Sequence, residues 1–88
     1  MKHINIIVEG KVQGVWFRDS TMKEAQRHGI KGFVRNEPDG SVYIEAEGDT
    51  DKLDGFVKWC HSGPEKAVVT NVGVSKGKFK DFMEFVIK

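Results

Sequence analysis

Residues 10–18 read G-K-V-Q-G-V-W-F-R and connect a run that predicts a strand, Ile4 to Glu9, to a run that predicts a helix. Gly10 and Gly14 bracket a tight connection, because glycine adopts the positive-φ geometry that turns successive backbone N–H groups toward one point. Such donors at the start of a helix bind anions. Arg18 adds a planar, permanently charged guanidinium that matches phosphate or carboxylate in two-point contact. The stretch therefore predicts a small phosphate-binding loop.

A second stretch, residues 32–48, reads G-F-V-R-N-E-P-D-G-S-V-Y-I-E-A-E-G. Together the two stretches resemble the two signatures of the acylphosphatase family, and the similarity in length and element order covers essentially all 88 residues. The resemblance implies an enzyme that hydrolyses acyl phosphates to a carboxylate and inorganic phosphate, with neither a metal nor a nucleotide cofactor. The glycine-lysine pair is no nucleotide P-loop, because no G-x-x-x-x-G-K-[ST] motif occurs.

Composition is that of a single domain spanning residues 1–88. The net charge of +1 indicates neither a nucleic-acid surface nor an acidic tail. A single cysteine, Cys60, cannot form an intrachain disulfide and fits a reducing compartment. The N-terminus lacks the apolar run of a signal peptide, and no segment reaches the length of a membrane span. We therefore expect a cytoplasmic monomer with no membrane or nucleic-acid partner.

The hydrophobic pattern predicts an α+β, ferredoxin-like βαββαβ sandwich, an antiparallel sheet with two helices on one face and an extra short C-terminal strand. The first helix begins at Thr21 if Thr21 and Glu24 form a capping box, whereas the resemblance implies a start nearer Arg18. The helix ends near His28, before Gly29. The second helix follows Asp49 or Thr50 and carries an apolar face of Leu53, Phe56, Val57 and Cys60. Strands are expected at residues 4–9, 30–36, 42–47, 67–74 and 82–87, with a solvated basic loop at 75–80 and the 42–47 strand half-buried.

Acyl phosphates need little catalytic machinery. Their carboxylate leaving group is a weak base and phosphoryl transfer is loose, so it is enough to hold the phosphate and place a water in line. We expect Arg18 to neutralise the phosphoryl oxygens and Asn36 to orient the water, and the resemblance implies the same pair. The proton of the water then ends on a phosphoryl oxygen. The phosphate would be held by the backbone N–H groups of Gln13, Gly14, Val15, Trp16, Phe17 and Arg18, with inorganic phosphate as product and competing ligand.

Other polar residues are weaker candidates. Glu9, Asp19, Glu37 and Asp39 invite a general-base role, but carboxylates at strand ends and turns are usually solvated. Glu37 follows Asn36, and its charge would weaken phosphate binding unless its side chain points to solvent. The three histidines have no metal-ligand spacing, and Cys60 on an apolar helix face predicts burial. Trp16 packs beside the loop or shapes a pocket for an aromatic acyl group.

Two alternative functions remain open at this stage. One is a non-catalytic phosphate or carbamoyl-phosphate binding module, although such a module has no need of Asn36. The other is an RNA-binding ferredoxin-like domain, which requires basic and aromatic residues on the sheet face. The strand from Ser41 to Glu47 is acidic, which disfavours RNA.

Overall fold

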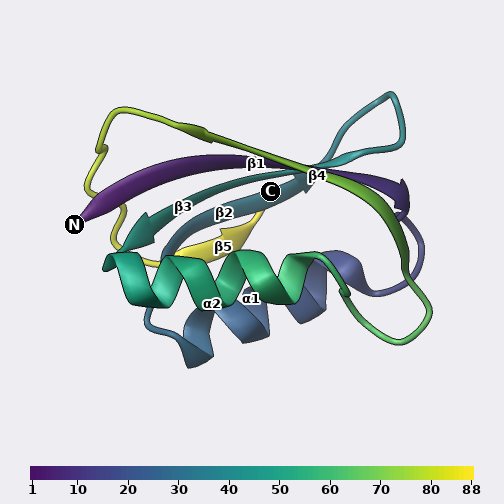
Figure 1. The fold of residues 1–88 in the computed structure, drawn as a ribbon, viewed down its shortest axis with the longest axis horizontal. Helices are drawn as coiled ribbons and strands as arrows, with labels where there is room; N and C mark the ends of the chain where they lie inside the picture. Colours follow the sequence, from purple (N-terminus) through teal and green to yellow (C-terminus); the bar gives the residue numbers. More distant parts are fainter.

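The computed structural model describes residues 1–88 as two layers, a five-stranded sheet with both helices on one face (Figure 1). The strand order is β4-β1-β3-β2-β5. The elements are β1 (Lys2–Lys11), α1 (Phe17–Arg27), β2 (Lys31–Asn36), β3 (Val42–Gly48), α2 (Thr50–Cys60), β4 (Val68–Lys76) and β5 (Phe85–Ile87). The predicted ferredoxin-like α+β class is confirmed.

The sheet is antiparallel, as predicted, except where the extra C-terminal strand β5 joins it. β5 pairs parallel to β2, from Gly32 opposite Phe85 to Val34 opposite Ile87. The chain reverses direction as it passes from β4, at one edge of the sheet, to the other edge. A strand opposite in direction to β4 is parallel to β2 there, so the sheet is mixed.

The core lies between the sheet and the helices, as the alternation of apolar residues predicts. In the central pair, Ile6 lies opposite Ile44 and Val8 opposite Val42, and all four side chains are fully buried. From the helix side the same core receives Phe17, Ala25, Leu53, Phe56 and Cys60. Burial raises the pKa of the Cys60 thiol to about 12, so this cysteine is a packing residue rather than a nucleophile.

Helix α1 begins at Phe17, which excludes a start at Thr21. Thr21 is fully buried inside the helix, and its hydroxyl has no hydrogen-bond partner. Glu24 instead binds Arg27 at 2.7 Å and His28 at 3.1 Å. The capping-box pattern was therefore coincidental. The helix ends at Arg27, with His28 as its C-cap and Gly29 following at a φ of 70°, as predicted.

The prediction that β3 is only half-buried is also wrong. Glu45 and Glu47 face away from the core, yet they are only 7% and 2% exposed. Residues 77–84, here called the crossing segment, lie against them. Glu47 accepts hydrogen bonds from the backbone N–H groups of Lys80 at 2.6 Å and Phe82 at 2.8 Å. The expected solvated loop is thus partly tied to the sheet by buried carboxylates.

Strand β1 changes register just before the predicted phosphate-binding loop. The irregularity lies between Glu9 and Gly10, where β1 pairs with β4. Gly10 has a φ of 127°, and a Cβ atom there would lie 2.1 Å from the carbonyl oxygen of Val68. Only glycine allows this approach, so the bulge fixes the direction in which the chain leaves the sheet.

Neither helix has the length and apolar character needed to cross a membrane.

Candidate active site

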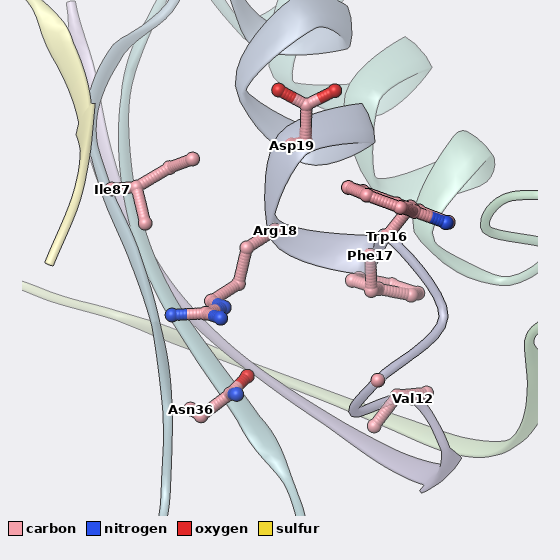
Figure 2. A pocket seen from close by; sticks show the side chains of 8 residues that line it. Val12, Trp16, Phe17, Arg18, Asp19, Asn36 and Ile87 are labelled. Carbon is pink, nitrogen blue, oxygen red and sulfur yellow. The ribbon is translucent and has the colours of Figure 1, made fainter.

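A pocket of about 360 Å³ opens where the start of α1 faces the ends of β2 and β5 (Figure 2). Its walls come from three parts of the chain: the loop before α1 together with the first turn of that helix, the end of β2, and β5. The pocket brings together the predicted pair, Arg18 and Asn36. The lining residues are Val12, Gly14, Trp16, Phe17, Arg18, Asp19, Asn36 and Ile87.

The loop before α1 has unpaired backbone donors. Gly14 has a φ of 72° and Trp16, the residue that caps α1, a φ of 64°. No backbone hydrogen bond of the chain uses an N–H donor from Gln13 to Asp19, and the first helical donor is Ser20, which binds the Trp16 carbonyl at 3.0 Å. Free N–H groups together with the positive end of the helix dipole make this loop suited to an anion.

Arg18 is the arginine that the fold leaves available. Arg27 is bound to Glu24 at 2.7 Å and Arg35 to Glu37 at 3.2 Å, and these are the other arginines of the chain. Arg18 is exposed and takes part in no salt bridge. Its guanidinium extends from the first turn of α1 toward Asn36 (Figure 2). The pocket therefore contains an unpaired guanidinium group that can bind two oxygens of one phosphate.

Asn36 lies at the end of β2, on the sheet face that carries the helices. Its Oδ1 atom is buried and has no hydrogen-bond partner within the chain. Buried polar atoms are almost always paired, so an unpaired one in a pocket marks a place where a water or ligand completes the hydrogen bonding. Side-chain amides both donate and accept, which allows Asn36 to orient a water molecule.

The two neighbours of Asn36 point to the opposite face of the sheet, since strand side chains alternate. Arg35 stacks over Tyr43, with its guanidinium carbon 4.8 Å from the ring centre, and binds Glu37. Glu37 borders a separate pocket with Pro38 and Tyr43. Its charge is thus paired and turned away from Arg18, which removes the concern that it would weaken phosphate binding.

Not all of the predicted phosphate-binding residues line the pocket. Gly14, Trp16, Phe17 and Arg18 do, whereas Gln13 and Val15 do not. Val15 is only 6% exposed and belongs to the core. The side-chain amide of Gln13 donates to the carbonyl oxygens of Glu37 at 2.8 Å and Ser41 at 2.9 Å. Gln13 therefore ties the loop to the β2–β3 turn, next to Asn36.

Three lining residues were not predicted as part of the site. Val12 belongs to the signature stretch, but nothing distinguished it from a packing residue. Ile87 reaches the pocket only because β5 pairs with β2, and no local pattern indicates that pairing. Asp19, which the sequence predicts to be solvated, borders the pocket and binds Lys23 at 3.0 Å.

Comparison with known proteins supports the family resemblance that residues 10–18 and 32–48 carry. The family model for acylphosphatase matches residues 4–87. A curated acylphosphatase from Thermotoga maritima is 48% identical over 88 residues, spanning 100% of this chain and 98% of the relative. One from Methylococcus capsulatus is 43% identical over 86 residues, spanning 93% and 94%. The crystal structure of acylphosphatase from Bacillus subtilis superposes with a TM-score of 0.97 at 36% identity, over 100% of this chain and 99% of that one. Because the chain has both signatures and shares its fold and length with these relatives, it belongs to the acylphosphatase family and is an acyl phosphate hydrolase.

Proposed function

We propose that Arg18 and Asn36 are the catalytic residues of this hydrolase and that the loop before α1 holds the phosphoryl group. The guanidinium of Arg18 binds two phosphoryl oxygens, and the free N–H groups between Gln13 and Arg18 bind the remaining charge. The observation that carries the proposal is the meeting, in one pocket, of an unpaired arginine and a buried unpaired asparagine oxygen.

The chemistry follows from this arrangement. A water bound to Asn36 attacks phosphorus in line with the carboxylate that leaves. The bond between phosphorus and the bridging oxygen breaks, and the carboxylate departs with its electron pair. Asparagine cannot accept a proton at neutral pH, so the proton of the water passes to a phosphoryl oxygen and inorganic phosphate forms. Arg18 and the loop stabilise the charge on the equatorial oxygens as the transition state develops.

The proposal also covers the domain, the oligomeric state, the partners and the cellular location of the protein. Residues 1–88 are proposed to act as one acylphosphatase-like domain and as a monomer, with acyl phosphate as the small-molecule substrate. A cytoplasmic location is supported by the buried free thiol of Cys60, which suits a reducing compartment. The proposal that nucleic acid is not a partner is supported by the acidic strand β3, whose glutamates are bound to the crossing segment.

The test is the hydrolysis of benzoyl phosphate in EDTA by wild type, Arg18→Ala and Asn36→Ala. Loss of a transition-state arginine is expected to lower kcat by about 10³–10⁵. Loss of the residue that positions the water is expected to cost about 10³ or more, the upper end for one preorganised donor. Phosphate release measured against time gives both values.

Matched controls separate these roles from general damage to the fold. Arg27→Ala removes an exposed arginine of the same helix, and Asn71→Ala removes an exposed asparagine of β4 that binds Glu9. Both are expected to hydrolyse at the wild-type rate. Asn36→Ala activity within a few-fold of wild type would disprove the assignment of the water. Phosphate binding through Arg18 without any turnover would instead indicate a binding module.

A further inference from the structure

A second cavity, of about 710 Å³, lies at the opposite end of the sheet from the candidate active site. Its walls come from the start of β1, the end of β4, the first two turns of α2 and the first part of the crossing segment. Figure 1 shows these parts together at the end that holds the N-terminus, whereas the loop before α1 lies at the other end. Strand β1 runs from one end to the other and rises about 3.3 Å per residue, which keeps the two cavities about 25 Å apart. The second cavity is therefore separate from the proposed catalytic residues.

The apolar side chains of this cavity leave much of their surface open to solvent. Val74 of β4 is 49% exposed and Phe79 of the crossing segment is 47% exposed. Ile4 and Val57 also line the cavity and are partly buried against the core. Exposed apolar surface that is gathered in one place marks a binding groove. A ligand with an apolar chain would remove Val74 and Phe79 from water.

The wall that carries Phe79 is held in place on both sides. The Gly77 N–H group donates a hydrogen bond to the carbonyl oxygen of His3 at 3.0 Å. The Lys80 N–H group donates to the Glu47 carboxylate at 2.6 Å. Ligand cavities are usually formed before the ligand arrives, because ordering a mobile segment on binding costs free energy. The backbone at Phe79 needs no such ordering.

Two lysines lie side by side in the lining. Lys76 of β4 lies opposite Ile4 of β1, and Lys2 lies two residues before Ile4 on the same face of the sheet. Such diagonal neighbours have Cβ atoms about 7 Å apart, so both ammonium groups can reach one carboxylate. The lysines that form salt bridges in this chain are Lys23 and Lys80, which leaves Lys2 and Lys76 unpaired.

The other ionisable side chains of the lining leave this positive charge in place. The ring of His3 is bound to Glu47 at 2.7 Å. Asp54 of α2 is exposed and forms no salt bridge with either lysine, and two lysines against one aspartate leave a net positive lining. A bound carboxylate would relieve the repulsion between Lys2 and Lys76, whereas a cation would add to it. Charge complementarity therefore favours an anionic head group beside the apolar walls.

We propose that this cavity binds a free carboxylate with an unbranched apolar chain. The chain lies against Val57, Val74 and Phe79, and the carboxylate lies between Lys2 and Lys76. A purely apolar molecule would leave the lysines without a partner, and a small anion would leave the apolar walls in water. The site is remote from Arg18 and Asn36, so this inference does not depend on the proposed function.

The first experiment measures the binding of decanoate to the wild-type protein, by calorimetry and by changes in the backbone amide NMR spectrum. Decanoate is expected to bind at least about 10²-fold more tightly than butyrate, which has the same head group and a shorter chain. It is also expected to bind at least about tenfold more tightly than decyltrimethylammonium, which has the same chain and the opposite charge. Equal binding of the two amphiphiles, or amide shifts away from Ile4, Val57 and Val74, would overturn the proposal.

Variants test the head group and the chain separately. Lys2→Gln combined with Lys76→Gln is expected to weaken decanoate binding about tenfold, because each exposed ion pair contributes a factor of about three. Phe79→Ala is expected to weaken it about tenfold as well. The matched controls are Lys66→Gln, in the loop after α2, and Met83→Ala, which is 83% exposed in the crossing segment; neither residue lines the cavity. Wild-type affinity in the double variant and in Phe79→Ala would overturn the assigned site.

Saturating inorganic phosphate distinguishes the two cavities. Decanoate is expected to bind equally well in its presence, because the proposed phosphate site lies at the other end of the sheet. Loss of decanoate binding on addition of phosphate would place decanoate in the candidate active site and overturn the separate site. Sedimentation of the unliganded protein tests the remaining occupant: dimerisation that shifts the amide signals of Val74 and Phe79 would assign the cavity to a second copy of the chain.

Discussion

At the scale of single residues, the site depends on which charged side chains the fold leaves unpaired. Arg27 and Arg35 are held by glutamates, and Arg18 alone among the arginines is free to meet a phosphate. Asp19 lies in the same pocket, but Lys23 binds it. A carboxylate leaving group and a loose transition state need no strong base. The pocket therefore holds a carboxylate that the proposed chemistry does not use.

Asp19→Asn tests this directly. Hydrolysis of acetyl phosphate is expected to stay within about threefold of wild type, whereas removing a general base costs about 10²–10⁴. The measurement is a pH profile of kcat between pH 4 and 8 for both proteins. A loss beyond about 10², together with loss of an acidic limb, would identify Asp19 as a base and contradict the mechanism.

Thr21 provides a prediction about stability. Its hydroxyl is fully buried in α1 without a partner, which costs free energy. Thr21→Val keeps the shape and removes the polar atom, so the free energy of unfolding is expected to rise by about 1 kcal/mol. Urea denaturation checks this, with Thr50→Val, at the exposed first residue of α2, as the control. A destabilised Thr21→Val would mean that the hydroxyl has a hydrogen-bond partner in solution.

At the scale of elements, Gln13 holds two parts of the site in register. Its amide bridges the loop before α1 to the carbonyl oxygens of Glu37 and Ser41, on either side of the β2–β3 turn. The loop carries the proposed phosphate donors, and Asn36 immediately precedes Glu37. The distance between phosphate and water thus depends on a side chain that touches neither.

Gln13→Ala is therefore expected to lower kcat by about 10-fold to 10²-fold, because misplacing reacting groups by about 1 Å costs up to about 10². Gln13→Glu, similar in shape but without the two donors, is expected to resemble Gln13→Ala. Inorganic phosphate should still inhibit both variants, since Arg18 is unchanged. Wild-type kcat in Gln13→Ala would show that the bond is dispensable for positioning.

At the scale of the whole molecule, the crossing segment is fastened to the sheet by buried carboxylates. Burial of Glu47 works to raise its pKa, but hydrogen bonds from the Lys80 N–H, from His3 and from the Phe82 N–H outweigh it and lower the pKa. Burial acts the same way on Glu45, and its bonds to Lys80 and Tyr43 lower that pKa. Both groups therefore stabilise the fold in their charged form.

The sign of the pH dependence follows. A group whose pKa is lower in the folded protein stabilises it above the unfolded pKa, here about 4.5, and this stability is lost as the pH falls through the folded pKa. The free energy of unfolding is expected to be level from pH 7 to about 5 and to decrease below about 4.5. Urea denaturation at pH 7, 5, 4 and 3 measures it.

Glu47→Gln tests where this pH dependence arises. The variant is expected to be less stable than wild type at pH 7 and to lose less on acidification, because one of the titrating groups is gone. Glu65→Gln, in the exposed loop after α2, is expected to follow the wild-type curve. A pH dependence in Glu47→Gln as steep as that of wild type would assign the acid sensitivity to other carboxylates.

The sequence by itself determined the layers and the order of the elements, and it predicted the pair Arg18 and Asn36, which the pocket brings together. These depend on local physics: alternation of apolar residues along a strand, helical spacing in α2, and glycines in a loop that leads into a helix. The family signatures could be recognised for the same reason, since each lies within one continuous stretch.

Only the tertiary structure decided the rest. The pairing of β5 with β2, which brings Ile87 to the pocket, depends on how the chain crosses the sheet. The burial of Glu45 and Glu47 depends on the crossing segment, and the orientation of Glu37 on the pleat and on Arg35. The first two join residues that are far apart in sequence. Local sequence patterns cannot predict such contacts, because the free energy of these contacts is gained only when the whole fold has formed.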